Sequence, residues 1–290
     1  MTYQLQIEQC MQPDAENLSD LLEALGALAV TLTDTFDDPI LEPPIGTTPL
    51  WPVVSISSLF AEEQLAMCAK EHVLNIHPNL QCAVTLLPER DWERAWMDDF
   101  KPRACGKRLW ICPSWLTPPD ENAANLILDP GLAFGTGTHP TTYLCLQWLD
   151  GYNLTQKKLI DYGCGSGILA LAALKLGAHH AYALDIDPQA HAATVQNAQL
   201  NHLTTQISVH YPDDFICEPV ELLIANILLA PLLTLKSTFH ALLQAQGQLV
   251  VSGILTTQVN TLVREYDELF AHQATLSQDD WALVIFTKKA

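Results

Sequence analysis

The chain has 290 residues, and a hydrophobic content of 49% is enough for a packed core in one large or two modest domains. Its 14 basic and 33 acidic residues give a formal net charge of −19, so its surface repels nucleic acid and attracts cationic partners. This charge argues against an RNA substrate, which needs a basic patch, and favours a basic protein. Acidity that serves only solubility is the alternative.

Cysteine usage and the absence of a targeting signal indicate the compartment. The eight cysteines are scattered, without a C-x-x-C pair or zinc-ligand spacing, so we expect reduced thiols and no metal site. The start MTYQLQIEQC has neither the basic residues nor the apolar core of a secretory signal. The most apolar window, from Leu222, is interrupted by Asn226, Pro231 and Thr234 and is too short to cross a bilayer. We expect a cytoplasmic monomer that does not contact a membrane.

Residues 1–90 are predicted to form an α+β ferredoxin-like domain. Apolar spacing predicts strands and helices in the order βαββαβ, over residues 3–7, 14–25, 27–32, 53–59, 61–74 and 82–87. This region holds thirteen carboxylates, opposed only by Lys70 and Arg90. It carries no nucleophile, metal cluster or glycine-rich turn. We interpret it as a domain that recognises a basic substrate, with a solvated structural domain as the alternative.

Residues 91–104 are predicted to be a linker between this domain and a second one, residues 105–290. The segment DWERAWMDDFKP places Trp92 and Trp96 on one face of a short helix that stops at Pro102. We expect the two indoles to pack on a neighbouring domain, and a contact with substrate is the alternative.

The segment LDPGLAFGTGTHPTT, residues 128–142, follows two short strand patterns at 108–115 and 125–128. Its glycines allow a backbone to close over a ligand, which predicts a lid next to the following cofactor site. Thr141 and Thr142 precede the helical pattern YLCLQWL, and we expect their hydroxyls to cap that helix, alone or while also binding the cofactor. A single histidine such as His139, considered without the rest of this segment, would be interpreted as a structural residue.

The segment from Leu159 predicts a strand, a tight glycine turn and a helix. The strand carries Asp161, and the turn contains Gly163, Gly165 and Gly167. A second strand pattern, residues 181–184, ends at Asp185, where a carboxylate can accept hydrogen bonds from a ribose diol. These residues are the predicted cofactor-binding set.

Ile168 decides which cofactor is expected. A dinucleotide turn, G-x-G-x-x-G, needs glycine where Ile168 stands, and the observed pattern is D-x-G-x-G-x-G. S-adenosylmethionine has no phosphate but carries an ammonium group, which explains a carboxylate at Asp161. An NAD-dependent oxidoreductase and a non-catalytic adaptor that keeps a cofactor pocket are the alternatives.

The remaining pattern predicts the class I methyltransferase fold, a Rossmann-like, mostly parallel seven-stranded sheet. Further strands and helices are expected at 188–200, 207–210, 220–225, 231–243, 248–252 and 257–270. The tail predicts an antiparallel edge hairpin that turns at residues 278–280. Asn226 follows a central strand, and a polar residue there points into the ligand crevice of such sheets.

Together, LDPGLAFGTGTHPTT, DYGCGSGILALAALKLGA, LDIDPQA and IANIL resemble the bacterial ribosomal protein L-eleven methyltransferase family, and the resemblance spans the chain. It implies methyl transfer from S-adenosylmethionine to the α-amine and lysine side chains of large-subunit ribosomal protein eleven. Another basic protein or a small-molecule amine is the alternative substrate. The resemblance also implies that the N-terminal domain holds the substrate. Glu221 departs from the family pattern, which has an Asp there.

The resemblance also implies site residues. It assigns cofactor contacts to Thr142, Gly163, Asp185 and Asn226, and a loop that closes over the methionine and the target amine to residues 134–139. We expect Asn226 to orient the amine, His139 to be a candidate proton acceptor and Phe134 to form an apolar wall that tolerates repeated methylation.

Overall fold

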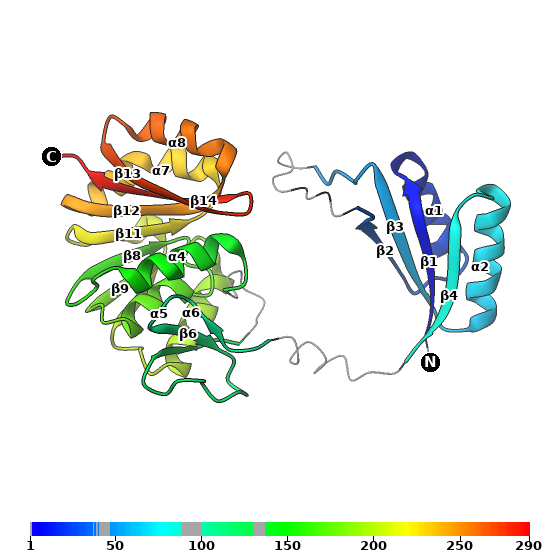
Figure 1. Ribbon diagram of the computed structural model, residues 1–290, viewed down its shortest axis with the longest axis horizontal. Helices are drawn as coiled ribbons and strands as arrows, with labels where there is room; N and C mark the ends of the chain where they lie inside the picture. The colour runs from blue at the N-terminus through cyan, green and yellow to red at the C-terminus, as the bar shows by residue number, and fades with distance from the viewer. Residues whose placement is uncertain (1, 37, 39, 41–46, 89–99, 130–136) are drawn as a thin grey trace. The chain divides into compact units, whose positions relative to one another are not determined.

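The computed structural model describes residues 2–36, 38, 40, 47–88, 100–129 and 137–290 (Figure 1). The chain divides into two compact units, Met1–Met97 and Asp98–Ala290. Most of the predicted linker helix, residues 91–99, lies outside the described residues. Its described end is not helical, because Pro102 lacks a backbone donor and the chain then forms the short strand β5, Arg103–Ala104.

The first unit has the predicted βαββαβ order. Its elements are β1 (Thr2–Met11), α1 (Gln12–Ala24), β2 (Ala29–Asp34), β3 (Val53–Phe60), α2 (Glu63–Ile76) and β4 (Gln81–Leu87). The strands form an antiparallel sheet in the order β2-β3-β1-β4. Leu5 and Ile56 of the sheet pack with Leu22 of α1 and Val73 of α2, so both helices cover one face of the sheet (Figure 1).

The second unit is built on a seven-stranded sheet in the order β10-β9-β8-β11-β12-β14-β13. Its further elements are β6 (Leu109–Cys112), β7 (Ala124–Ile127), α4 (Pro140–Gly151), β8 (Lys158–Tyr162), α5 (Ile168–Lys175), β9 (His180–Leu184), α6 (Pro188–Leu200), β10 (Ile207–His210), β11 (Val220–Asn226), α7 (Leu229–Leu242), β12 (Leu243–Leu255), α8 (Val259–Tyr266), β13 (Phe270–Gln278) and β14 (Trp281–Lys288). Strands β10, β9, β8, β11 and β12 run parallel to one another. Strand β14 is antiparallel to both of its neighbours, β12 and β13. The predicted parallel sheet with an edge hairpin is confirmed.

Helices cover both faces of this sheet, which explains its apolar central strands. One face of the sheet packs with α4 and α5 through residues such as Leu146 and Leu171. The opposite face packs with α7 and α8 through residues such as Phe239 and Leu262. Because a strand between two helix layers is buried on both sides, β11 reads VELLIAN, without polar alternation.

Several predicted boundaries are wrong. The helix predicted over 257–270 ends at Tyr266, and Phe270 already begins β13. The strand predicted over 108–115 ends at Cys112, before Pro113, which has no donor for a sheet ladder.

Within the described chain, no helix is both long and apolar enough to cross a bilayer. All eight cysteines are free thiols.

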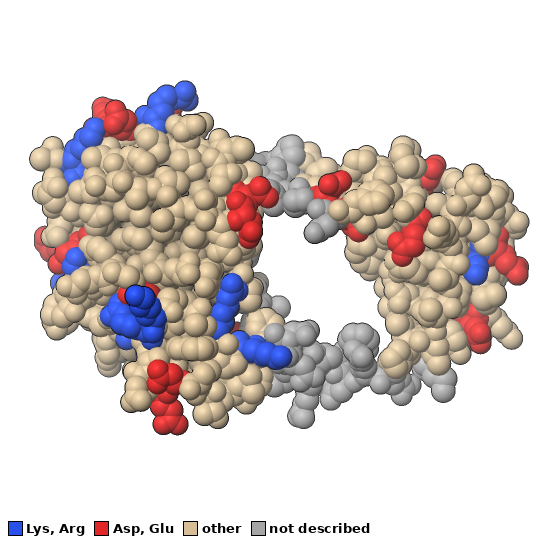
Figure 2. Space-filling view, in the orientation of Figure 1, with Lys and Arg blue, Asp and Glu red and all other residues tan. Residues whose placement is uncertain are grey.

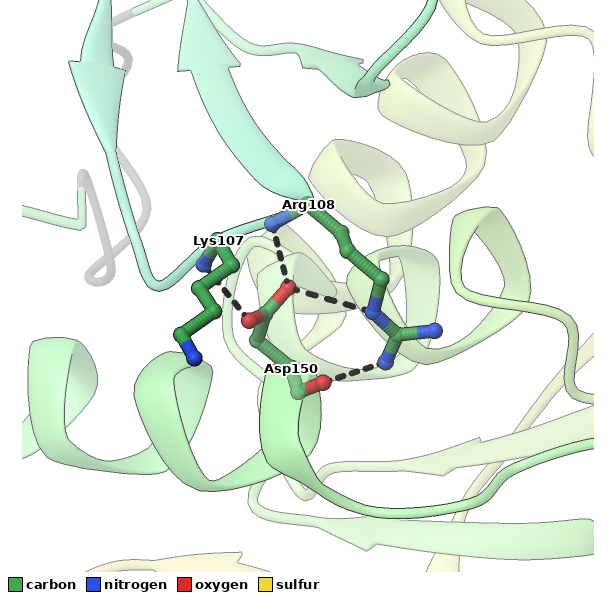
Figure 3. A network of polar contacts seen from close by, with 3 residues as sticks. All are labelled: Lys107, Arg108 and Asp150. Atoms are coloured by element: carbon green, nitrogen blue, oxygen red, sulfur yellow. Dashed lines mark hydrogen bonds and ion pairs between the residues drawn. The ribbon is translucent and has the colours of Figure 1, made fainter.

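Asp150, at the end of α4, fixes the backbone that leads into β6 (Figure 3). Its side chain is buried and accepts hydrogen bonds from the backbone nitrogens of Lys107 and Arg108, at 2.7 and 2.9 Å. The Arg108 guanidinium donates to the Asp150 carbonyl and lies 3.6 Å from its carboxylate. Gly106 is left-handed, with φ +108°, and a Cβ there would lie 2.3 Å from Asp150 Oδ2. Only glycine therefore fits this turn.

Asp150→Ala should lower the free energy of unfolding by about 1–3 kcal/mol, because two backbone donors and the Arg108 guanidinium lose a buried, charged acceptor. Asp267→Ala is the matched control, since that side chain is exposed and pairs with Lys289 at 3.3 Å. Urea titration of both variants measures the difference. Equal stabilities would contradict the role of Asp150.

Candidate functional site

The predicted site residues on β8, β9 and β11 lie at the carboxyl edge of the large sheet. In the parallel ladder, Asp161 is opposite Ala183 of β9 and Ile224 of β11. The chain segments that follow these three strands therefore emerge side by side. This edge brings the glycine turn, Asp185 and Asn226 together, as expected for an open α/β sheet.

The glycine turn has the predicted strand-turn-helix geometry. Gly163, Gly165 and Gly167 all have positive φ, at 77°, 52° and 76°. The nitrogens of Gly163 and Cys164 donate to the Leu184 carbonyl of β9, which holds the turn against the neighbouring strand. Gly167 is the N-cap of α5. Three positive-φ positions at alternate residues favour glycine, which has no Cβ.

Asp161 is a buried carboxylate with one unpaired oxygen. Its exposure is 1%, and Oδ2 accepts from the Ala170 nitrogen at 2.9 Å. Oδ1 has no hydrogen-bond partner. Burial raises the pKa of Asp161 to about 7; the Ala170 hydrogen bond partly opposes this, and the nearby Asp185 charge adds to it. A cation beside Oδ1 would satisfy this oxygen, so the ammonium of S-adenosylmethionine fits here.

Asp185 is fixed by two backbone donors, one in the glycine turn and one in its own loop. Its Oδ2 accepts from the Gly165 nitrogen at 2.9 Å, and its Oδ1 accepts from the Asp187 nitrogen at 3.0 Å. Both oxygens retain lone pairs for further donors such as ribose hydroxyls. The next residue, Ile186, is 83% exposed and was not among the predicted site residues. An exposed apolar side chain at this edge gives a base a surface to contact.

Asn226 contacts α4, where Thr142 lies. Its Nδ2 donates to Thr142 Oγ1 at 3.2 Å, so two residues 84 positions apart in the chain lie together. Thr142 is buried at 1% exposure in the first turn of α4. The structure therefore places these two predicted site residues in contact with each other, at the same edge as the glycine turn.

The predicted capping of α4 by threonine hydroxyls is wrong. His139 is the N-cap residue, and its Nδ1 accepts from the Thr141 nitrogen at 3.3 Å and lies 2.7 Å from Thr141 Oγ1. Pro140 occupies the first helical position, which it favours, so both threonines fall inside the helix. The His139 ring meets Trp281 edge-on at 4.8 Å. Burial lowers the pKa of His139, which favours the neutral imidazole.

Only part of the predicted lid is described. Phe134, Gly135 and Thr136 lie outside the described residues, whereas Gly137, Thr138 and His139 lie within them. Glu221 stands near the start of β11, away from the carboxyl edge, and accepts from the Lys158 nitrogen at 3.1 Å. Among the described residues, no group of three or more acids, histidines or cysteines could hold a metal ion.

The sequence analysis missed Ile227, which is wedged between two glycines. A Cβ on Gly163 would lie 2.4 Å from Ile227 Cγ2, and one on Gly253 would lie 2.6 Å from the Ile227 carbonyl. The Ile227 nitrogen donates to the Ser252 carbonyl at 3.2 Å. Gly253, with φ +83° inside a buried strand, is the sequence signal that was available, because a strand glycine often marks a close approach of backbones.

Arg103 is a second missed residue. Its Nη1 donates to the Thr138 carbonyl at 3.2 Å, and its guanidinium lies 4.3 Å from the centre of the Tyr143 ring. A cavity of about 500 Å³ adjoins this arginine. It is lined by Leu128, Gly137 and Thr138, from both ends of the predicted lid, and by apolar residues including Ile111. This cavity has the size and apolar lining of a small ligand site.

Comparisons with known proteins agree with the resemblance. The profile of the family described as "Ribosomal protein L11 methyltransferase (PrmA)" matches residues 2–289. A protein named ribosomal protein L11 methyltransferase from Legionella pneumophila is 54% identical over 290 residues, covering 100% of both chains. One of the same name from Nitrosococcus oceani is 47% identical, covering 93% of each. The crystal structure of a ribosomal protein L11 methylase from Lactobacillus delbrueckii superposes with a TM-score of 0.61 at 30% identity, covering 66% of this chain and 100% of the other.

Gly253→Ala should lower the free energy of unfolding by about 2–4 kcal/mol and weaken cofactor binding, because the new methyl group collides with the Ile227 backbone in a left-handed conformation. Gly151→Ala is the matched control, since nothing lies within 4 Å of that added Cβ and the residue ends a helix. Urea titration and cofactor calorimetry measure both effects. A Gly253→Ala protein as stable as the control would contradict the wedge.

Asp161→Asn should change how stability depends on pH. Because the folded pKa of about 7 is raised from the ordinary 3.8, the folded state holds its proton more tightly, and the wild type loses stability as the pH rises from about 4 to about 7. The variant lacks this component and should be at least as stable as the wild type at pH 8. It should also bind S-adenosylmethionine more weakly, since the ammonium loses its carboxylate. Denaturation at pH 5 and pH 8, with calorimetry, tests this. Parallel pH profiles would contradict the assignment.

Proposed function

The chain belongs to the ribosomal protein L11 methyltransferase family, and we propose from this that it transfers methyl groups from S-adenosylmethionine to the α-amine and lysine side chains of ribosomal protein L11. The observation that carries the proposal is the match over residues 2–289, which includes the acidic unit as well as the methyltransferase sheet. A nicotinamide-dependent enzyme would need glycine in place of Ile168.

The residues proposed to hold the cofactor each have a chemical role. Asp161 receives the ammonium at its unpaired oxygen, and Asp185 accepts from the ribose hydroxyls. The turn formed by Gly163, Gly165 and Gly167 lets the nucleoside approach the backbone. Thr142 is placed beside Asn226, where its hydroxyl can donate to the carboxylate of the cofactor.

The chain's task in the reaction is to present a neutral amine in line with the methyl group. The bound sulfonium supplies an activated methyl group, so orientation contributes more than a strong base. A lysine with an ordinary pKa of about 10.4 is almost fully protonated at neutral pH, whereas an α-amine near 8 is less so. We propose that the Asn226 carbonyl oxygen orients the amine lone pair through the amine protons. Neutral His139 is the candidate acceptor of the released proton.

The first unit is proposed to hold the substrate. Glu16, Asp20 and Glu23 are exposed and spaced by four and three residues, so they follow one face of α1. No ion pair joins them to a lysine or arginine of the described chain. Figure 2 shows acidic side chains outnumbering basic ones on the visible face of this unit. Such a face attracts a basic protein and speeds its association. Another basic protein, or a small-molecule amine, is the alternative substrate.

Asn226→Ala should lower kcat/KM for L11 by about 10- to 100-fold, because the amine loses a positioning group. The assay incubates purified protein with labelled S-adenosylmethionine and L11, and mass spectrometry then counts the methyl groups at each amine. Asn153→Ala, at an exposed position outside the site, is the control and should keep full activity. The same incubation is repeated with a cell lysate. If only proteins other than L11 are labelled there, L11 is not the substrate. Full turnover by Asn226→Ala would remove its positioning role.

A further inference from the structure

A second cavity, of about 420 Å³, lies at the far end of α5 from the glycine turn. It is lined by three cationic residues, Lys107, Arg108 and Lys175, together with polar and small groups. The chain has only 14 basic residues in total, so this grouping is unusual for a protein with a net charge of −19. Because α5 is eight residues long, about 12 Å of helix separates the cavity from the glycine turn. It is not part of the methyl-transfer site.

Hydrogen bonds hold the backbone of this cavity at Lys107 and Arg108. Asp150 holds the Lys107 and Arg108 nitrogens, and Gly106 admits no side chain against it. Figure 3 shows the Arg108 side chain folded back along Asp150, whereas the Lys107 side chain extends without a bond to that carboxylate. Both side chains therefore start from a turn that is already ordered, so a ligand need not order this backbone when it binds.

Two of the three cations, Lys107 and Lys175, have no ion-pair partner among the described residues. Arg108 has Asp150 as an ion-pair partner, at 3.6 Å. Lys175 is half-buried, and among the described residues neither its ammonium nor that of Lys107 has a hydrogen bond or an ion pair. Burial lowers the pKa of Lys175, as expected where a cation loses water without gaining a partner. One carboxylate, Asp120, also lines the cavity, and its Oδ1 accepts from the Asn122 nitrogen at 2.9 Å, so three cations face a single lining anion.

We propose that this cavity binds a phosphate-type oxyanion held by Lys107, Arg108 and Lys175. A tetrahedral oxyanion offers several acceptors to converging donors, and an arginine with two lysines supplies both directional donors and mobile point charges. Binding would give the half-buried Lys175 an ion-pair partner, which it does not have among the described residues. The same chemistry is carried by inorganic phosphate, by a free nucleotide and by the phosphodiester of a single RNA strand. Methyl transfer does not enter this proposal.

The test titrates the full-length protein with inorganic phosphate at constant ionic strength, set with chloride, and follows the lysine side-chain amines by NMR. We expect saturable binding at millimolar concentrations, with the Lys175 pKa raised on binding. Lys175→Gln and Lys107→Gln should each weaken binding at least fivefold. Lys289→Gln is the control, because that lysine pairs with Asp267 elsewhere. Binding that is absent, or equal in all variants, would overturn the proposal.

Two further arms identify the source of the phosphate. Adenosine monophosphate and a short single-stranded RNA are each titrated against phosphate-saturated protein. Displacement of phosphate by RNA alone assigns the site to a phosphodiester, and displacement by the nucleotide alone assigns it to a free phosphate monoester. Lys175→Gln should keep the L11 methylation rate, so failure of this proposal is distinguishable from failure of the proposed function.

Discussion

The site depends on the packing of Ile227 between two glycines. Gly163 follows β8, Ile227 follows β11 and Gly253 lies in β12, so this contact joins three neighbouring parallel strands at their carboxyl edge. The side chain of Ile227 fills the space at Gly163, and its backbone fills the space at Gly253. Asn226 is the residue just before the wedge, and its position against Thr142 follows from it. Cofactor turn and proposed amine-positioning group are therefore fixed by one steric constraint.

The same edge carries an electrostatic cost. An unpaired carboxylate oxygen at 1% exposure opposes ionisation, which is why the pKa of Asp161 is raised to about 7. A protein that only needed to cap α5 could use a neutral acceptor to receive the Ala170 hydrogen bond. The retained carboxylate is explained if a cation occupies Oδ1 during function. Under that proposal, the buried carboxylate lowers the stability of the cofactor-free protein and raises its affinity for the cofactor, as perturbed groups at functional sites often do.

The sequence predicted most of the fold because its signals are local. Apolar runs, the glycine turn at 163–167 and the closing hairpin each specify their own backbone, and the residues at the strand ends were identified from sheet topology. The missed features depend on contacts between distant segments. Asp150 supports residues 106–108, Arg103 supports Thr138, and Ile227 faces Gly163 and Gly253. The predicted cap on α4 is wrong because Ser and Thr are commoner caps than His, whereas Pro140 favours the first helical position and so makes His139 the cap.

Charge is distributed unevenly between the two units. Twelve of the 14 basic residues follow residue 90, and thirteen carboxylates precede it. This asymmetry supports the proposal that the first unit attracts a basic substrate. The proposed methyl-transfer edge offers Asp161, Asp185 and neutral polar groups, with no lysine side chain among its proposed contacts. If the cofactor's ammonium and ribose occupy Asp161 and Asp185 as proposed, only neutral groups would remain beside the substrate amine, and loss of water there would favour release of its proton. Long-range attraction and local deprotonation make opposite electrostatic demands, and placing them on separate units lets one chain satisfy both.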